Sequence, residues 1–262
     1  MSAESRTCDY CADVFTIESE DFAYYEKINV PPPKLCAVCR FRRRLAWFKA
    51  FRLYKRACDL CGEIKVSMYR PDAPYVVYCP DCWWSDKWDQ LECGRDYDPS
   101  RPFFEQYDEL LHKAPLLGLL VDKFSMPTSP YNNYIGHAKK TYLTYYSDNN
   151  EDCSYGFFLS KNKSLFNCIS EWESECCYDT INGYRNFKVI GSFSNVHNSI
   201  ECCFVKDGKN LEHCFGSASI FNKKYVFFNE QLSKEEYLKR RELIDLGSYK
   251  TYEKMRLLAE ET

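Results

Sequence analysis

Residues 186–222 read NFKVIGSFSNVH, NSIECCFVKDGK and NLEHCFGSASIF and then Asn222, so three consecutive blocks of twelve residues each begin with Asn. The same step of twelve extends back to residue 138, and Asn occupies six of its eight positions. These positions are Ala138, Asn150, Asn162, Ser174, Asn186, Asn198, Asn210 and Asn222. The side chain four residues after each of them is mostly apolar or Cys. A fixed period of this kind is typical of proteins built from stacked repeats.

The segments between these positions are rich in β-branched and aromatic residues, which favours strands over helices. We therefore expect a mainly β chain in which residues 138–232 form a β-solenoid, with each twelve-residue segment making half of a coil. Asn tolerates left-handed backbone at the turns, and its amides can form a ladder between stacked coils. A β-sandwich with evenly spaced hairpins is the alternative. Seven cysteines are expected to serve mostly as small buried side chains, namely Cys153, Cys168, Cys176, Cys177, Cys202, Cys203 and Cys214.

Helix signals stand on both sides of the repeat region. Residues 100–114 have the pattern of a short helix with Ser100 as its N-cap, within a lead-in to the solenoid that covers residues 95–137. Residues 233–246 predict a helix capped by Ser233, and a second, shorter helix follows it. We expect the C-terminal segment from residue 233 to residue 262 to be a helical cap. Such a cap would cover the open edge of the solenoid, which otherwise invites aggregation.

Four CxxC motifs stand in the first 82 residues. They are Cys8-x2-Cys11 with Cys36-x2-Cys39, separated by 24 residues, and Cys58-x2-Cys61 with Cys79-x2-Cys82, separated by 17. A CxxC turn presents two thiolates to one metal ion, and two such turns complete a tetrahedral site for Zn²⁺. Because four protein ligands leave no position for water, we expect two structural zinc ions and no catalytic metal.

The spacing alone leaves the pairing of the four motifs open. Sequential pairing gives two zinc ribbons, residues 1–39 and residues 58–94, in which a hairpin brings two knuckles together. Cross-bracing would instead pair the first motif with the third and the second with the fourth, and disulfides are a further alternative. His213 beside Cys214 is expected to be a solenoid side chain, because no second His or CxxC accompanies it.

The N-terminal sequence MSAESRTCDY has neither a basic n-region nor an apolar h-region, so it predicts no secretory signal. No apolar run approaches the length of a membrane span. Cysteines in a reducing compartment stay free or bind metal. We therefore predict a cytoplasmic chain without a membrane partner, whose sixteen cysteines are metal ligands or free thiols.

The first module also carries a family resemblance. It contains Cys8-Asp-Tyr-Cys11, Phe15, Ser19, Asp21-Phe22, Tyr24-Tyr25-Glu26-Lys27, Pro32-Pro33 and Cys36-Ala-Val-Cys39-Arg40. This pattern resembles the bacterial "probable zinc-ribbon domain" family, which has a CxxC knuckle, an acidic-aromatic segment, a Pro and a CxxCR knuckle. The resemblance covers residues 8–44 and departs from the family at Ile28, where the family usually has Gly. It implies zinc binding by the four cysteines and no known activity, and the layout of the whole chain is similar to proteins from environmental bacterial genomes.

The segment between the two modules is strongly basic. From Lys27 to Cys58 the chain has ten of its 35 basic residues and none of its 38 acidic ones, so the rest of the chain has a net charge of −13. We expect residues 40–57 to form a basic aromatic connector that is helical, with part of its positive charge on one side. The candidate nucleic-acid contacts are Arg40, Arg42, Arg43, Arg44, Lys49, Arg52, Lys55 and Arg56.

Basic residues interleaved with aromatic ones suit phosphate contacts combined with base stacking. We therefore predict a non-enzymatic zinc protein that binds nucleic acid, specifically RNA or a ribonucleoprotein. Trp83, Trp84 and Trp88 would either extend the stacking surface or form a small core. The alternative is an assembly scaffold that binds protein partners through the solenoid, with the connector docked on an acidic protein surface.

Catalytic motifs are absent from the sequence. There is no Gly-rich phosphate loop, nucleophile elbow or HExxH motif, and no small-molecule substrate is predicted. A carbohydrate-active β-solenoid enzyme is the remaining enzymatic hypothesis, because glycoside chemistry needs paired carboxylates. The candidates for such a pair are Glu171, Glu173, Glu175 and Asp179.

Overall fold

The computed structural model describes residues 2–49, 51–126 and 128–261, and their contacts separate into two compact units, residues 1–49 and residues 50–262. The first unit contains β1 (Glu4–Thr7), β2 (Val14–Ile17), α1 (Ser19–Lys27) and α2 (Ala37–Leu45). The second unit begins with β3 (Tyr54–Ala57), β4 (Ile64–Ser67), β5 (Val77–Tyr78), α3 (Pro80–Trp83), a 3-10 helix (Gln90–Cys93), α4 (Phe103–Lys113), β6 (Leu116–Leu117) and a second 3-10 helix (Lys123–Ser125).

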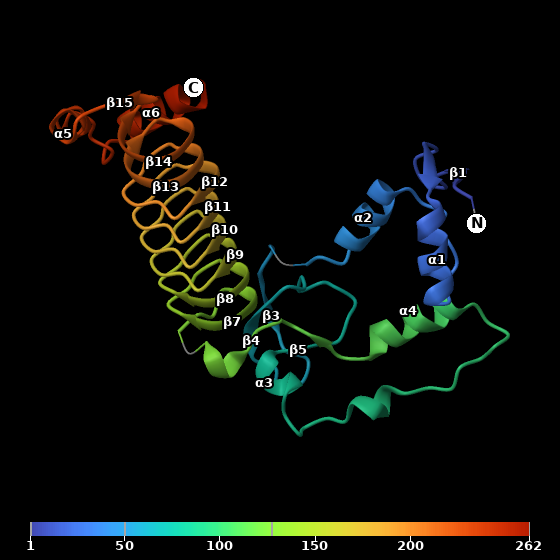
Figure 1. The fold of residues 1–262 in the computed structure, drawn as a ribbon. Helices are drawn as coiled ribbons and strands as arrows, with labels where there is room; N and C mark the ends of the chain where they lie inside the picture. Colours follow the sequence, from blue (N-terminus) through green and yellow to red (C-terminus); the bar gives the residue numbers. More distant parts are fainter. Residues whose placement is uncertain (1, 50, 127, 262) are drawn as a thin grey trace. The chain divides into compact units, whose positions relative to one another are not determined.

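The rest of the second unit is the repeat region and two helices (Figure 1). It contains β7 (Asn133–Lys139), β8 (Tyr145–Glu151), β9 (Phe157–Ser160), β10 (Ile169–Trp172), β11 (Ile181–Tyr184), β12 (Phe193–His197), β13 (Lys206–Phe215), β14 (Ala218–Phe227), β15 (Glu230–Gln231), α5 (Lys234–Glu242) and α6 (Tyr249–Glu261). No helix within the described ranges is both long and apolar enough to cross a membrane.

In the first unit, a hairpin and two helices enclose very little apolar surface. β1 and β2 pair antiparallel, and α1 begins at a capping box formed by Glu18 and Asp21. The buried apolar residues and cysteines among the described part of this unit are Cys8, Ile17, Phe22 and Cys39. A core of this size gives little stability by burial alone, and a metal ion held by the four cysteines of this unit would add to it.

The second unit opens with the β3–β4 hairpin, and residues on both sides of this hairpin contact the segment that leads into the solenoid or its first coils. β5 pairs in parallel with β6, and the Met68 N–H donates to the Gly118 carbonyl at 2.8 Å. Phe51 packs against Tyr145 and Phe157, with ring centroids 5.4 and 5.0 Å apart. The second cysteine module and the solenoid therefore form one packed body.

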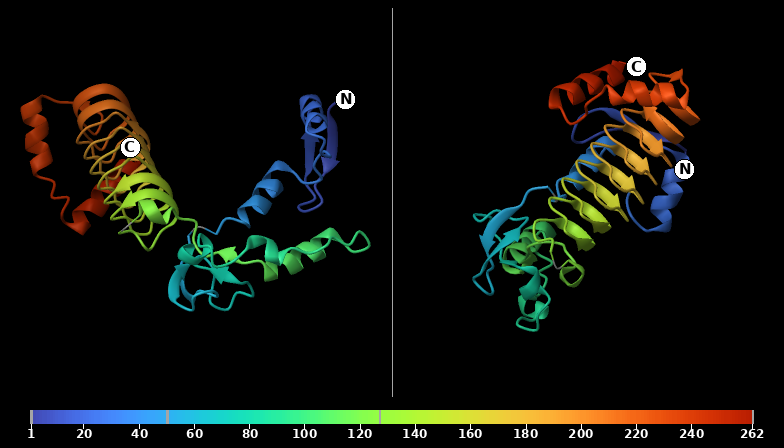
Figure 2. Two further views of the ribbon diagram at one scale, coloured as in Figure 1. Left: turned by 90° about the horizontal axis from the view of Figure 1, so that it is seen from below. Right: turned by 90° about the vertical axis from the view of Figure 1, so that its left-hand side faces the viewer.

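Strands β7 to β14 lie in chain order in one parallel sheet, as the stacked arrows of Figure 2 show. Asn133 lies opposite Tyr145 and Ile169 lies opposite Ile181, so each position pairs with the one twelve residues later. The predicted β-solenoid is confirmed. One complete coil has twelve residues, however, and the expectation that twelve residues make half of a coil is wrong.

The coil closes within twelve residues because its backbone turns at every third one. From Tyr134 to Lys188, every third residue has a left-handed φ between 44° and 59°. The residue that follows each of these turns points into the coil, and all such residues from Ile135 to Val189 are buried. Each twelve-residue coil therefore has four inward-facing positions. The expected coil of two extended segments would have had far more inward side chains.

Before residue 193, the periodic Asn side chains lie inside the coil and not at its left-handed turns. Asn150, Asn162 and Asn186 are buried. Oδ1 of Asn150 accepts from the backbone N–H and from Nδ2 of Asn162, both at 3.1 Å, and that Nδ2 also donates to the Glu171 carbonyl at 2.8 Å. The predicted amide ladder is present, but its task here is to satisfy buried backbone groups of the coil.

A single inserted residue moves the Asn period from the inside of the coil to its surface. Gly183 pairs with Val196, which is thirteen residues later. Beyond this shift Asn198, Asn210 and Asn222 have left-handed φ values of 50°, 54° and 54°, and their amides hydrogen-bond along the surface. The turn role expected of Asn is therefore confirmed for these three residues only.

The remaining inward positions are mostly small or apolar, as a narrow coil requires. Six of the seven solenoid cysteines are buried, and Cys176 is exposed at a left-handed turn. The buried ones are Cys153, Cys168, Cys177, Cys202, Cys203 and Cys214. Their expected role as small hydrophobic side chains is confirmed.

The helices at the two sides of the repeat differ from their predicted bounds. Ser100 does not cap α4, because its N–H and Oγ donate to Asp98 at 2.9 and 2.6 Å, and Pro102 precedes the helix instead. Oγ of Ser233 caps α5 as predicted, accepting a backbone N–H at 3.2 Å. α5 nevertheless ends at Glu242.

α6 lies against the side of the coils. The Tyr252 hydroxyl donates to Asp179 at 2.8 Å, and its ring packs on Phe204 with centroids 5.2 Å apart. The open edge of the last coil is instead partly covered by β15, which pairs antiparallel with β14. α5 also contacts β14, where Tyr237 packs against Phe227 with ring centroids 6.4 Å apart, so the predicted C-terminal helical cap is present and lies beside the last coils.

Glu171 points into the solenoid core and is fully buried. Its Oε2 accepts from Ser174 Oγ at 3.0 Å, whereas Oε1 has no hydrogen-bond partner among the described residues. Gly183 in the next coil makes room for it, since a Cβ there would lie 2.1 Å from Oε1. Burial raises the pKa of Glu171 to about 7, although the nearby polar side chains of Thr180, Ser174 and Asn186 oppose the rise.

This carboxyl makes stability depend on pH. Its pKa is about 7 in the folded state and about 4.3 in an unfolded chain, so its protonated form is favoured by folding and stability falls as the pH rises through 7. We expect Glu171→Gln to raise the free energy of unfolding by about 2 kcal/mol more at pH 9 than at pH 5. Urea unfolding at both pH values measures this difference.

Glu173→Gln is the matched control, because Glu173 is partly exposed and Arg185 holds its pKa below the usual value. Its effect on unfolding should change little between pH 5 and pH 9. Equal pH dependence in the wild type and in Glu171→Gln would contradict the assignment.

Candidate metal centres

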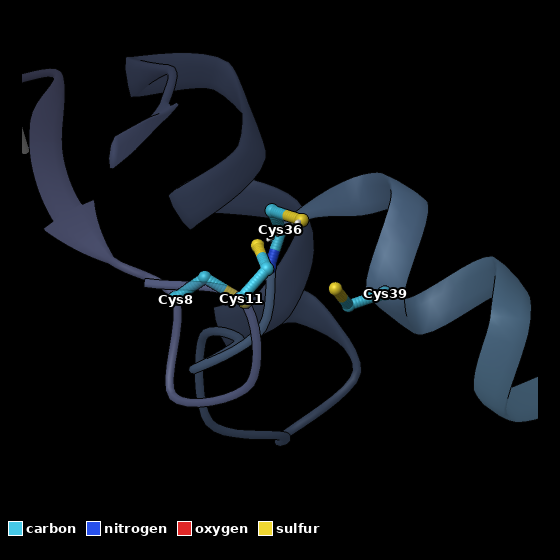
Figure 3. A group of neighbouring side chains, drawn as sticks. All are labelled: Cys8, Cys11, Cys36 and Cys39. Atoms are coloured by element: carbon cyan, nitrogen blue, oxygen red, sulfur yellow. Dashed lines mark hydrogen bonds between the residues drawn. The ribbon is translucent and has the colours of Figure 1, made fainter. Parts of the chain in front are cut away.

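The first cysteine cluster joins a hairpin turn to the start of a helix (Figure 3). Cys8 and Cys11 follow β1, whereas Cys36 is the N-cap of α2 and Cys39 lies in its first turn. The four Sγ atoms all lie within 4.8 Å of one another, and those of Cys11 and Cys36 are 3.8 Å apart. A tetrahedral ion with four sulfurs at about 2.3 Å places neighbouring sulfurs about 3.8 Å apart.

The second cluster repeats this arrangement. Cys58 and Cys61 lie between β3 and β4, Cys79 is the N-cap of α3, and Cys82 lies within that helix. Their Sγ atoms also lie within 4.8 Å of one another. Sequential pairing of the four motifs is therefore confirmed, and cross-bracing is wrong. The second motif of each cluster opens a helix, however, and does not close a second hairpin.

Backbone N–H groups stabilise a thiolate in each cluster. The Cys36 N–H donates to Cys8 Sγ at 3.3 Å, and the Cys79 N–H donates to Cys58 Sγ at 3.2 Å. The N–H of Cys11, assisted by that of Cys36, lowers the pKa of Cys8 to about 6 although burial opposes it. Burial likewise raises the pKa of Cys58, but backbone N–H groups outweigh it and bring the value to about 7.

The neighbouring thiols shift in the other direction. Burial, followed by the effect of Cys79, Cys61 and Cys58, raises the pKa of Cys82 well above its usual range. Burial and Cys36 likewise raise the pKa of Cys39. Four thiolates at this spacing repel one another, so a bound cation is what allows all four to be charged together.

The donor set decides which role such an ion can have. Four sulfur ligands in tetrahedral arrangement suit a borderline-soft divalent cation such as Zn²⁺. All four positions would be filled by protein, so no position remains for water or a substrate. Either cluster can therefore hold a structural metal ion, whose binding stabilises the fold around it.

The two modules share a local sequence that includes an arginine. Residues 6–14 read RTCDYCADV and residues 56–64 read RACDLCGEI, with left-handed backbone at Ala12 (φ 62°) and Gly62 (φ 75°). In the first module Nη1 of Arg6 donates to the Pro33 carbonyl at 3.4 Å. In each module, the arginine two residues before the first CxxC motif thus hydrogen-bonds to the segment that connects the two CxxC motifs.

Arg56 occupies this position in the second module and is only 8% exposed. Its guanidinium donates to Asp59 at 2.9 Å and to the carbonyls of Arg70 and Tyr75 at 3.0 and 2.7 Å. The expectation that Arg56 contacts nucleic acid is therefore wrong, because the side chain is used to hold the metal loop. The repeated Arg-x-Cys-Asp-x-Cys pattern is the sequence signal that separates Arg56 from the other basic residues.

The rest of the basic segment is divided between helix, loop and strand. α2 ends at Leu45 and Tyr54–Ala57 form β3, so a continuous helix over residues 40–57 is wrong, and Ala50 lies outside the described residues. Four arginines of this segment lie on α2, and Arg42, Arg43 and Arg44 are exposed whereas Arg40 is partly buried. Beyond the helix, Arg52 and Lys55 are exposed and Lys49 is partly buried.

The three tryptophans at the end of the second cysteine module also differ in their exposure. Trp83 and Trp88 pack with ring centroids 5.0 Å apart, and Trp88 Nε1 donates to the Trp83 carbonyl at 3.1 Å. Tyr78 packs on Trp88 at 5.2 Å. These residues form the small core expected as the alternative, whereas Trp84 is 63% exposed.

The four carboxylates of the enzymatic hypothesis have different surroundings. Glu171 is buried, Glu173 pairs with Arg185 at 2.8 Å, Glu175 is exposed, and Asp179 accepts from Tyr252. His213 stacks on Tyr225 and bonds Glu201 at 3.1 Å, in accordance with a solenoid side chain. None of the metal-binding groups found among the described residues includes His213.

No model of a known protein family matches the chain, and a search of curated proteins found no match. The resemblance of residues 8–44 to the zinc-ribbon family therefore stays a prediction.

We expect two metal ions per chain in native mass spectrometry. Cys36→Ser/Cys39→Ser should retain one ion, because each cluster binds independently through its own four sulfurs. Cys176→Ser, which changes an exposed solenoid thiol, should retain two. Two ions in the double variant, or fewer than two in the wild type, would contradict the ligand assignment.

Arg56→Gln should lower the free energy of unfolding by about 2 kcal/mol, because it removes charge-assisted hydrogen bonds and leaves buried carbonyls without a partner. Arg52→Gln is the control, since its exposed side chain should change stability by less than about 0.5 kcal/mol. Denaturant unfolding in the presence of zinc measures both. Equal effects would show that Arg56 has no structural role.

Proposed function

We propose that the chain is a non-enzymatic protein that carries Zn²⁺ in both clusters and binds single-stranded RNA through the basic residues of α2. The observation that carries the proposal is the exposure of Arg42, Arg43 and Arg44 on a helix whose first turn belongs to a metal cluster. Fixed cationic side chains at a metal-stabilised position suit contacts to a phosphate backbone.

The arrangement of these arginines on α2 supports contacts to a flexible strand. Successive residues of a helix are about 100° apart, so the three side chains cover about 200° of its circumference. Arg40 lies one helical turn before Arg44, and its Nη1 donates to the Tyr25 hydroxyl at 3.4 Å. With no acidic residue between Glu26 and Asp59, no carboxylate of this segment competes with phosphate.

Aromatic side chains accompany the arginines. Phe41 is 55% exposed on α2, and Trp47 just beyond the helix is 66% exposed. Unpaired bases stack on such rings with little sequence preference, whereas the stacked bases of a duplex cannot reach them. This is the reason to favour a single strand over a duplex.

The metal has a definite part in this proposal. Cys36 and Cys39 fix the first turn of α2, so the loaded cluster would pre-organise the arginines and reduce the entropy lost on binding. The ion itself contacts no RNA. Its removal should weaken binding by loosening the helix on which the arginines stand.

A second candidate is supported by exposed aromatic residues on the solenoid. Tyr142, Phe166 and Tyr178 occupy the same coil position and are 42–43% exposed. A row of apolar side chains on a repeat surface is typical of a protein-binding face. A scaffold of this kind would need no affinity for RNA, so the experiment below separates the two functions.

Fluorescence anisotropy with a labelled 15-nucleotide oligouridine, measured over a salt series, tests the RNA proposal. Arg42→Gln/Arg43→Gln/Arg44→Gln should reduce the slope of log K against log salt by about 2, since each lost phosphate contact contributes about 0.7. The control is Lys140→Gln/Lys161→Gln/Lys206→Gln, which removes equal charge from exposed solenoid positions. It should change the slope by much less.

Two results would contradict the proposal. One is the absence of measurable binding at low salt by the zinc-loaded wild type. The other is an equal loss in the two triple variants, which would show that only the net charge of the chain matters.

A further inference from the structure

An apolar groove of about 710 Å³ lies within the second unit, beside the first coils of the solenoid. Trp84, which follows α3, lines it together with Leu120 and Phe124 from the segment that leads into the repeat. The coils contribute Tyr134, Tyr146, Phe158 and Trp172, among others. We call this hollow the aromatic groove. Its volume falls within the range of sites for small molecules.

The repeat sequence itself creates the hollow. One outward position of successive coils is occupied by Gly136, Asp148, Ser160 and then Trp172, so three small residues form a floor and a large ring ends it. A Cβ at Gly136 would lie 3.1 Å from Asp148 Oδ1. Because Gly136 has no side chain, the floor of the groove at this position is as deep as the backbone of the coil allows.

An aromatic ladder forms one wall, and it stops where the groove stops. Tyr134 and Tyr146 stack with ring centroids 4.5 Å apart and planes 9° from parallel, and Phe158 follows at 5.7 Å. The same left-handed turn position is occupied by Ser170 and Asn182 in the next two coils. Aromatic residues thus occupy this position only in the coils that border the groove.

Large rings are left exposed at this concave site. Trp84 is 63% exposed, Phe158 44% and Trp172 41%, although they converge from separate parts of the second unit. Exposed apolar side chains gathered in a hollow mark a binding site more often than isolated ones do.

The charges at the groove are mainly negative. Its lining includes Asp122 and Asp148, and none of the lining residues that the structure describes is Lys or Arg. His137 contacts Asp148 Oδ1 through Nδ1 at 2.9 Å, and this carboxylate raises the pKa of His137. Only one group of the described lining, His137, can therefore carry positive charge against the two carboxylates.

We propose that the aromatic groove binds a small organic cation, a quaternary or otherwise alkylated ammonium that carries apolar substituents. The electron-rich faces of the rings attract such a cation, and its substituents bury against the rings, while Asp122 or Asp148 compensates its charge. A phosphate-bearing or carboxylate ligand is disfavoured, because it would meet two carboxylates and no described basic side chain except His137. This site is separate from the arginines of α2 and needs no RNA.

Isothermal titration of the zinc-loaded chain with benzyltrimethylammonium tests the proposal, with Trp fluorescence as a second readout. The matched probes are benzyl alcohol, which is neutral, and benzoate, which is anionic. We expect the cation to bind at least tenfold more tightly than either. Equal or tighter binding of benzyl alcohol or benzoate, or no binding of the cation at 10 mM, would overturn the proposal.

Variants locate the site. Trp84→Phe and Tyr146→Leu should each weaken binding of the cation about threefold or more, and Asp148→Asn should reduce its advantage over benzyl alcohol. Phe221→Leu is the control, because Phe221 is 68% exposed at the coil position of Trp172 but lies four coils away. If Phe221→Leu weakens binding as much as Tyr146→Leu, the cation binds solenoid rings in general and the groove assignment is wrong. The comparison of probes on the wild-type chain needs no variant to fold.

Discussion

Hydrogen bonds between successive coils hold the repeat in a backbone that an isolated chain avoids. A left-handed residue other than Gly costs about 1–2 kcal/mol, and each coil has four such turns. Contacts such as the Tyr155 N–H to the Tyr142 carbonyl at 2.9 Å offset this cost only when coils are stacked. The turns also leave room for just four inward side chains, so the core combines Cys and apolar residues with an Asn ladder and one buried carboxyl opposite Gly183.

In the two cysteine modules, metal binding would have the stabilising role that the stacking of coils has in the solenoid. The first unit buries little apart from cysteine sulfur, Ile17 and Phe22, so a metal ion bound by its four thiolates would contribute much of its stability. The same ion would fix the first turn of α2, because Cys36 and Cys39 belong to the cluster that can hold it. Metal binding by the first cluster would therefore both stabilise the first unit and hold in place the helix that presents Arg42 to Arg44.

The sequence predicts the parts of this structure that depend on spacing. Twelve-residue periodicity predicts the solenoid and the four CxxC motifs predict both clusters, because each requires fixed intervals in the chain. The coil length could not be predicted, since residues such as Tyr134 and Lys140 rarely adopt the left-handed backbone they have here. The single inserted residue before Val196 shifts the periodic Asn residues from the core to the surface while keeping their period of twelve. The repeated Arg-x-Cys-Asp-x-Cys pattern sets Arg56 apart, but its hydrogen bonds to the carbonyls of residues 70 and 75 depend on the fold of the whole module.

We propose that α2, held by the first cysteine cluster, is the RNA-binding element. Hydrogen–deuterium exchange of the zinc-loaded chain with and without oligouridine tests this directly. We expect RNA to slow exchange in residues 37–49 and to leave the amides of β7 to β14 unchanged. Protection that appears on the solenoid strands, with none in residues 37–49, would contradict it.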